Sequence, residues 1–244
     1  MIKNKMIPVK NKKVVIVGAS SGIGRALAYM FSEKGAIVYL ISRTLKTLEQ
    51  VKSELPNEAY IHTMDMLNDK SVESVFSKIG HFDYLSLTAV ADETKLMSPI
   101  KSMTNNIAQR GMEKFWGTFN VTREASKYIN TDGAMIVTSS ISIYRPSKNG
   151  ASIMNAASAA VATYAKSLAL EIAPVRVNII APGVVGTGVW TEEQLNGYES
   201  WAQNTLPVKH LGKPEELAYA YFSTLTNPYM TGSVVTVDGG LTMI

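Results

Sequence analysis

The chain has 244 residues, of which 46% are hydrophobic and 18% charged, an ordinary balance for a globular protein with a well-filled core. Its formal net charge of +4 does not indicate nucleic-acid binding, because five lysines fall within the first thirteen residues and the rest is about neutral. The absence of cysteine excludes disulfides, thiolate nucleophiles and cysteine-ligated zinc, and no metal site is expected.

The N-terminus is basic, and we predict that residues 1–12 form a flexible tail before a single domain over residues 13–244. No apolar segment of signal-peptide length follows this tail. No apolar run approaches the roughly 18 residues needed to cross a bilayer. We therefore expect a cytoplasmic protein that binds neither membranes nor nucleic acid.

From residue 13 onward, short β-branched runs alternate with stretches that carry apolar residues at helical spacing. "KVVIVG" is typical of a buried parallel strand, and "IGRALAYMFSEKG" of a helix that ends at glycine. The predicted strands lie at 13–18, 36–42, 59–65, 83–90, 134–140, 175–182 and 233–240. The predicted helices lie at 23–35, 44–55, 70–79, 113–129, 155–172, about 192–204, and 214–226.

This alternation predicts one α/β domain of Rossmann type, with a doubly wound, parallel, seven-stranded sheet. Parallel strands need crossover connections, and the helices supply them on both faces of the sheet. No linker, repeat or low-complexity segment divides the chain. A ligand is expected at the carboxyl edge of such a sheet.

The first strand-to-helix turn reads "GASSGIG", from Gly18 to Gly24. Its three glycines let the backbone turn tightly and approach a diphosphate, and the helix that opens near Ile23 presents free N–H groups to it. The position after a strand and before a helix favours a dinucleotide site over a purely structural turn. The expected contacts from this turn are Gly18, Ser20, Ser21, Gly22, Ile23 and Gly24.

The spacing of these glycines resembles that of the short-chain dehydrogenase/reductase family. "RVNIIAPG" at 176–183, "PVKHLGKPEELA" at 207–218 and "TGSVVTVDGG" at 231–240 resemble later motifs of that family, in the right order. The resemblance covers about residues 12–240. It implies a nicotinamide cofactor, and Asp65 matches the family's adenine-contacting acid. Further cofactor contacts that it implies are Met66, Ala89, Pro182, Gly183, Val185 and Thr187.

The end of the second predicted strand bears on which nicotinamide cofactor is bound. An NAD site needs a carboxylate there to accept from the ribose hydroxyls. This chain has Ser42 followed by Arg43, which suits the 2′-phosphate of NADP(H). The alternative is that Arg43 is a solvated cation that stacks on adenine. The chain also departs from the family after the fourth strand, where Asn-Asn-Ala-Gly is replaced by Leu87 to Val90.

The resemblance also implies a set of catalytic positions. In the family a Tyr transfers the proton, a Lys one helical turn later lowers that Tyr's pKa, a Ser binds the substrate oxygen, and an Asn supports the Lys. Ser140 matches the Ser, with Ser139 the less favoured neighbour. Met154 and Ser158 stand at the Tyr and Lys positions, so this chain resembles a divergent member that lacks the Tyr-x-x-x-Lys pair.

Two other side chains are candidates to replace that pair. Lys114 falls at the Asn position, and we hypothesise that its ammonium reaches the vacated Lys site and polarises the substrate oxygen together with Ser140. The alternative is a lysine whose stem packs while its head reaches water. Tyr144 and Lys148 repeat the spacing, but Arg145-Pro146 predicts a loop there, so Tyr144 is kept only as a possible proton donor.

The leading function is that of an NADP(H)-dependent oxidoreductase that acts on a small carbonyl or alcohol by an atypical mechanism. We expect a homo-oligomer, either a dimer or a tetramer. One alternative is a cofactor-binding pseudoenzyme that acts as sensor, scaffold or partner subunit. Another is a lyase or isomerase that uses the same pocket. Trp190, Tyr198 and Trp201 are expected to form an apolar lid, and the aromatics of helix 113–129 an oligomer interface.

Overall fold

The computed structural model describes residues 9–89, 96–146, 148, 150–188 and 190–244. The β-branched runs form a parallel seven-stranded sheet in the order β3-β2-β1-β4-β5-β6-β7, as predicted. The strands are β1 (Lys13–Val17), β2 (Ile37–Ser42), β3 (Ala59–Thr63), β4 (Phe82–Leu87), β5 (Ile129–Thr138), β6 (Arg176–Pro182) and β7 (Val234–Val237). The α-helices are α1 (Gly22–Glu33), α2 (Leu45–Glu54), α3 (Asp69–Ile79), α4 (Asn105–Gly111), α5 (Glu113–Ala125), α6 (Ser152–Glu171), α7 (Glu192–Thr205) and α8 (Pro214–Thr226). Short 3₁₀ turns are η2 (Ile100–Ser102), η3 (Ile141–Ile143) and η4 (Leu241–Met243).

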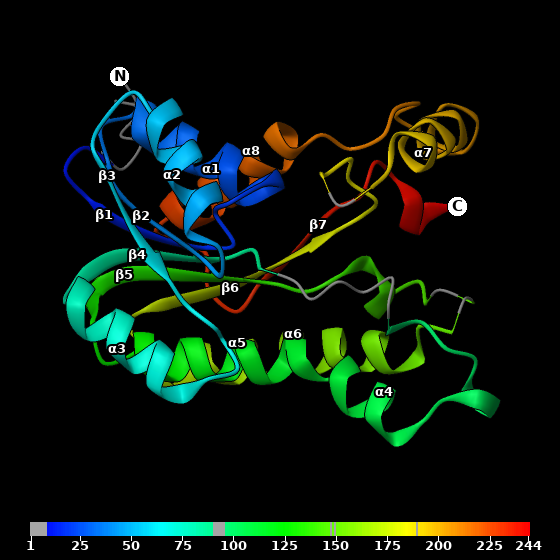
Figure 1. Cartoon of the computed structure of the whole chain (residues 1–244), viewed down its shortest axis with the longest axis horizontal. Coiled ribbons are helices and arrows are strands. Elements are labelled where there is room, and N and C mark those ends of the chain that lie inside the picture. Colours follow the sequence, from blue (N-terminus) through cyan, green and yellow to red (C-terminus); the bar gives the residue numbers. More distant parts are fainter. Residues whose placement is uncertain (1–8, 90–95, 147, 149, 189) are drawn as a thin grey trace.

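Helices cover both faces of the sheet, as a doubly wound fold requires (Figure 1). α1, α2 and α8 lie on one face, and α3, α5 and α6 lie on the other. Each layer buries its own apolar cluster, with Leu27 and Tyr221 in the first and Phe76 and Val121 in the second. α4, α7 and the C-terminal residues lie beyond the carboxyl ends of the strands (Figure 1).

The boundaries differ from the sequence prediction mainly around β5. This strand begins at Ile129 rather than at residue 134, because Ile129 pairs with Phe82 before a register shift in β4. The helix predicted to run to residue 129 therefore ends at Ala125. α4 was not predicted, since seven residues are too few to show a helical period. β7 ends at Val237, before Gly239 and Gly240 turn the chain at positive φ.

The last residues of the predicted tail pack against the domain. Val9 is 4% exposed and lies in the apolar cluster that α1 helps to form. The N–H of Asn11 donates to the carbonyl of Gly35, and Lys12 donates to Asp83. Residues 9–12 thus join the domain, while residues 1–8 lie outside the described part of the chain. In the described residues, no helix is long and apolar enough to cross a membrane.

Candidate active site

The register of the parallel strands brings the predicted site residues to one edge. Val17 at the end of β1 lies opposite Ile41 of β2 and Leu87 of β4. The residues that follow these three strand ends therefore leave the sheet at the same level. The strand order also reverses at β1 and β4, and α/β sheets bind ligands in the crevice at such a point.

The glycine turn is packed so closely that side chains would not fit. Gly18 has φ +97°, and a Cβ there would lie 2.5 Å from the backbone nitrogen of Ala89. A Cβ on Gly24 would collide with the carbonyl oxygen of Gly18. The side chain of Thr88 contributes to this packing, since its hydroxyl donates to the carbonyl of Val17 at 3.0 Å. The turn therefore holds the start of α1 against the ends of β1 and β4.

The opening of α1 is accessible to a ligand. Ser21 is the N-cap residue and is exposed, its side chain makes no capping hydrogen bond, and Ser20, Gly22 and Ile23 are half-buried. Gly22 has φ +52°, and a Cβ there would lie 3.0 Å from Cγ2 of Thr187. The structure thus brings together two segments that lie 165 residues apart and that the resemblance assigned to one cofactor.

The end of β2 carries a cation and no carboxylate. The Ser42 hydroxyl lies 3.3 Å from both the backbone nitrogen and the carbonyl oxygen of Thr44. Arg43 is exposed, and none of the described residues forms an ion pair with it. Asp65 is exposed after β3, and its Oδ1 accepts from the N–H of Leu67 at 3.0 Å. These three residues lie at or just after the carboxyl ends of β2 and β3, which are neighbouring strands of the sheet.

Met66 and Ala89 play mainly packing roles in the observed contacts. The carbonyl of Met66 accepts from the Asn120 amide at 3.0 Å, and its methyl group covers Gly117 of α5. The N–H of Ala89 donates to Val17 at 3.0 Å. Val90, which the sequence singled out as a bulky replacement for glycine, lies outside the described residues.

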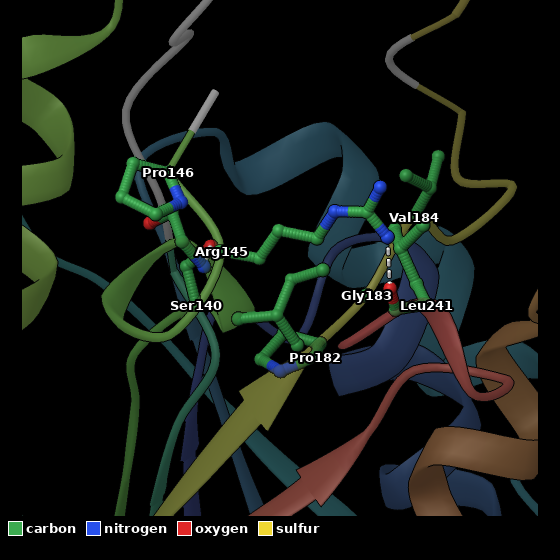
Figure 2. A pocket seen from close by; sticks show the side chains of 9 residues that line it. Ser140, Arg145, Pro146, Pro182, Gly183, Val184 and Leu241 are labelled. Carbon is green, nitrogen blue, oxygen red and sulfur yellow. Dashed lines mark hydrogen bonds between the residues drawn. The ribbon is translucent and has the colours of Figure 1, made fainter. Parts of the chain in front are cut away.

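Ser140 lines a pocket beyond the ends of β5 and β6. The pocket has a volume of about 320 Å³ and is lined by Ser140, Ile141, Ser142, Arg145, Pro146, Pro182, Gly183, Val184 and Leu241 (Figure 2). The Ser140 hydroxyl caps η3 by accepting from the N–H of Ser142 at 3.1 Å. Ser139 is 1% exposed and does not line the pocket. The geometry therefore favours Ser140 over its neighbour as a ligand-binding group.

Lys114 belongs to α5, and its side chain reaches both the backbone of Ser139 and Ser158 on α6. Its Nζ donates to the carbonyl of Ser139 at 3.0 Å and to the hydroxyl of Ser158 at 3.2 Å. The Ser139 hydroxyl in turn donates to the carbonyl of Ser158 at 2.8 Å. Lys114 is 9% exposed, so the alternative of a head group reaching water does not describe it. Its positive charge lies one peptide unit from Ser140.

Met154 and Tyr144 do not meet at the pocket. Met154 is 6% exposed and packs with Leu96 and Ala151. Tyr144 is 56% exposed, follows η3 in a non-helical segment, and is absent from the pocket lining. Neither side chain therefore lines the pocket that Ser140 lines.

The loop after β6 leads from the pocket toward the aromatic cluster of α7. Gly183 packs against Asp238, where a Cβ would lie 2.7 Å from Cα, and Val185 is buried and bridges to Gly212. The Trp190 and Tyr198 rings lie 4.7 Å apart, and Trp201 packs edge-on against Tyr198. These rings form one aromatic cluster, and Gln194 and Gly197 line a second pocket together with Tyr198 and Trp201. Contact between this cluster and a ligand stays a prediction.

Comparison with known proteins decides the family. A family model described as "Enoyl-(Acyl carrier protein) reductase" matches residues 18–242. The chain belongs to the short-chain dehydrogenase/reductase family. This reductase-family chain is 29% identical to "Carbonyl reductase family member 4" of Xenopus laevis, over 95% of its own length and 98% of that protein. It is 30% identical to "Uncharacterized oxidoreductase YghA" of Escherichia coli strain K12, over 95% of its own length and 83% of that protein.

A solved structure agrees in fold over almost its whole length. This is L-sorbose reductase from Gluconobacter frateurii, complexed with NADPH and L-sorbose. It is 27% identical to our dehydrogenase/reductase chain, covers 98% of it with 99% of its own length, and superposes with a TM-score of 0.86. The chain thus belongs to a family of oxidoreductases. The comparisons do not identify its catalytic residues.

Two features of the pocket were missed by the sequence analysis. Arg145 was considered only as part of a loop that rules out a helix, yet its side chain lines the pocket. Leu241 comes from η4, a hundred residues later, and lines the same pocket. A cation five residues after Ser140 in the sequence was the available signal for the first. Nothing in the sequence signalled the second, because only the packing of η4 brings it there.

Proposed function

We propose that this protein is an NADP(H)-dependent oxidoreductase that transfers hydride to or from a small carbonyl or alcohol substrate. The observation that carries the proposal is the carboxyl edge described above, where the glycine turn after β1 and Arg43 after β2 follow paired strand ends. The fit to a dinucleotide is supported by the start of α1, where Ser21 makes no side-chain capping bond and the first backbone N–H groups can serve a diphosphate. The carbonyl substrate class is supported by the relative named as a carbonyl reductase.

Each part of the edge has a proposed role toward the cofactor. Gly18, Gly22 and the exposed N–H groups at the start of α1 hold the diphosphate, with Ser20, Ser21, Ile23 and Gly24 shaping the turn. Ser42 and Arg43 hold the 2′-phosphate, while Asp65, Met66 and Ala89 line the adenine side. Pro182, Gly183, Val185 and Thr187 hold the nicotinamide end. L-sorbose reductase, whose fold matches 98% of this chain, was solved in complex with NADPH, which supports the same cofactor here.

The chemical step that we propose uses Ser140 and Lys114. The bound cofactor supplies the hydride. Ser140 donates a hydrogen bond to the substrate oxygen, where negative charge develops. The buried Lys114 ammonium stabilises that charge through the Ser139 peptide group to which it donates. Water supplies the proton, since the pocket is open to solvent and no described tyrosine lines it.

A second candidate function follows from Met154. This side chain carries no exchangeable proton and is packed between Leu96 and Ala151. Loss of a general acid typically costs 10² to 10⁴ in rate, which suits a cofactor-binding pseudoenzyme that serves as a sensor or scaffold. The lyase or isomerase alternative has no observation of its own and is not pursued.

Calorimetric titration with NADPH and then with NADH tests the cofactor proposal. We expect NADPH to bind more tightly. Arg43→Ala is expected to weaken NADPH binding about tenfold or more, because charge-assisted hydrogen bonds to the phosphate are lost, and to leave NADH binding unchanged. Lys52→Ala is the matched control, since Lys52 is an exposed cation at the other end of α2.

The outcomes separate the candidates. If neither nucleotide binds, the oxidoreductase proposal is wrong. Equal binding of the two nucleotides contradicts only the role of Arg43. If NADPH binds but a broad panel of carbonyl compounds is not reduced, the pseudoenzyme becomes the better account.

The homo-oligomer and the cytoplasmic location stay predictions. The oligomer is supported by the aromatic side chains that α5 and α6 present together. Phe115 and Phe119 pack edge-on against Tyr164, and Trp116 beside them is 53% exposed. Such a face is typical of a helix-to-helix interface between two copies.

A further inference from the structure

The pocket that holds Ser140 contains one charged side chain among its described lining residues, and that side chain is Arg145. Arg145 follows η3, and its backbone N–H donates to the carbonyl of Ile141 at 2.9 Å. Pro146 comes next and restricts the backbone further. Figure 2 shows the side chain extending from this anchored position across the pocket, toward Val184 and Leu241.

The partner of the guanidinium is neutral. One of its nitrogens, Nη1, donates to the main-chain carbonyl of Leu241 (Figure 2). None of the carboxylates in the described part of the chain forms an ion pair with Arg145. A guanidinium has five N–H donors arranged to fit a carboxylate, and such a pair is stronger than a bond to a carbonyl. The contact with Leu241 therefore leaves most of this binding capacity unused.

The turn that Arg145 touches is also held by hydrogen bonds that do not involve Arg145. Asp238 holds this turn, since its carboxylate accepts from the N–H of Gly240 at 2.9 Å and from that of Thr242 at 2.7 Å. Arg145 adds to these a single bond, to the carbonyl of Leu241, and makes it from an exposed side chain. A purely structural role is thus a poor explanation for a cation that lies across the pocket.

We propose that Arg145 is a specificity-determining residue that binds a carboxylate of the substrate, so that the substrate class is oxo acids and their hydroxy-acid counterparts. This inference rests on the proposed function, because it takes the substrate oxygen to be at Ser140 in the same pocket. The guanidinium exchanges its neutral partner for the substrate carboxylate. The pocket of about 320 Å³ also includes Pro182 and Gly183, which are proposed to hold the nicotinamide, so the space left for the substrate suits a small acid.

The test compares acids with their methyl esters, which keep the carbonyl but remove the charge. The probes are pyruvate, acetoacetate and levulinate, each beside its methyl ester, titrated calorimetrically into the protein saturated with NADP⁺. We expect at least one acid to bind more tightly than its ester. Arg145→Gln removes that preference, weakening the acid about tenfold or more, and leaves ester binding and NADPH binding unchanged. Lys148→Gln, which removes an exposed cation three residues away, keeps the preference.

Reduction of the same acids and esters is then measured by steady-state kinetics with NADPH as hydride donor. We expect the preference for the acid to appear as a lower KM rather than as a higher kcat. The inference is overturned if no acid binds more tightly than its ester, total absence of binding included, or if Arg145→Gln keeps the preference. A fall in NADPH affinity in Arg145→Gln also overturns it, because Arg145 would then bind the cofactor. Failure of the wild-type protein to bind NADPH contradicts the proposed function instead, so the two failures are distinguishable.

Discussion

At the scale of single residues, the arrangement around Ser140 depends on one buried charge. Lys114 comes from α5, yet its Nζ lies 3.2 Å from the hydroxyl of Ser158 on α6, where the family resemblance places a lysine. A cation delivered from a different helix can therefore supply positive charge to the same region. What it does not supply is a phenol, and this is why the proton is assigned to water.

Lys114→Met should lower kcat for a carbonyl compound that the wild-type protein reduces. The expected loss is about 10- to 100-fold, because one source of stabilisation for the developing negative charge disappears. KM should change little, since Lys114 contacts the Ser139 carbonyl rather than the substrate. Steady-state kinetics with NADPH measures both constants.

Two further variants separate this role from a structural one. Lys114→Arg keeps a positive charge and should recover part of the rate. Lys166→Met removes an exposed lysine from α6 and should change neither constant. An unaltered kcat in Lys114→Met, with the fold intact by circular dichroism, would make Lys114 a packing residue only.

At the scale of secondary-structure elements, the turn between β1 and α1 is closely packed, because a Cβ on Gly24 would lie 2.2 Å from the carbonyl oxygen of Gly18. Gly24→Ala should lower the free energy of unfolding by about 1–3 kcal/mol, because the new methyl group meets the backbone of Gly18, which cannot move aside cheaply. NADPH affinity should fall with it, as the turn opens away from its binding geometry. Urea denaturation and calorimetry provide the two measurements.

Gly197→Ala is the matched control for this substitution. Gly197 also lies within a helix, α7, but a Cβ there meets nothing within 4 Å. Alanine should therefore stabilise the protein by about 0.5–1 kcal/mol through its better helix propensity. If the two substitutions had the same effect, close packing of the glycine turn would not be the cause.

The elements that the sequence predicted well are those whose periodicity or motif is local. The seven strands and the glycine turn follow from β-branched runs and from three glycines at fixed spacing. β5 was predicted too short because its first residues, "INTDG", carry no strand pattern, and Ile129 joins the sheet only by pairing with Phe82. Arg145 and Leu241 were missed for a similar reason, since their meeting depends on tertiary packing over 96 residues.

At the scale of the whole molecule, the carboxyl and amino ends of the parallel strands carry different groups of residues. The carboxyl edge carries the site, whereas the amino edge carries an ionic cluster around Asp83 of β4. Asp83 accepts from Lys12 Nζ at 2.7 Å, from the N–H of Lys13 at 2.9 Å and from the Asn130 amide at 3.1 Å. This cluster ties the start of β1 to β4 and β5. Changes there should alter stability and leave cofactor binding unchanged.

Asp83 makes one contribution to the pH dependence of stability, through its lowered pKa. Burial raises that pKa, but the hydrogen bonds from Lys12, Lys13 and Asn130 outweigh burial and hold it below its ordinary value. The folded state therefore favours the ionised carboxylate. Its contribution to stability is complete above the unfolded pKa of about 3.9 and is lost as pH falls through the lower, folded pKa.

Asp83→Asn should accordingly lower the free energy of unfolding by about 1–3 kcal/mol at neutral pH, because the Lys12 ammonium loses its charged partner. The difference from wild type should shrink as the pH falls below about 4, where protonation removes the same charge from the wild-type protein. Urea denaturation across this range measures it, with Asp132→Asn as control. Asp132 is 73% exposed and 3.5 Å from Lys12, so its removal should cost less than about 0.5 kcal/mol. At sufficiently low pH the Asp83 carboxyl of the wild-type protein is neutral in both the folded and the unfolded state. If the difference in unfolding free energy between Asp83→Asn and wild type stays constant down to that pH, packing rather than charge makes Asp83 important.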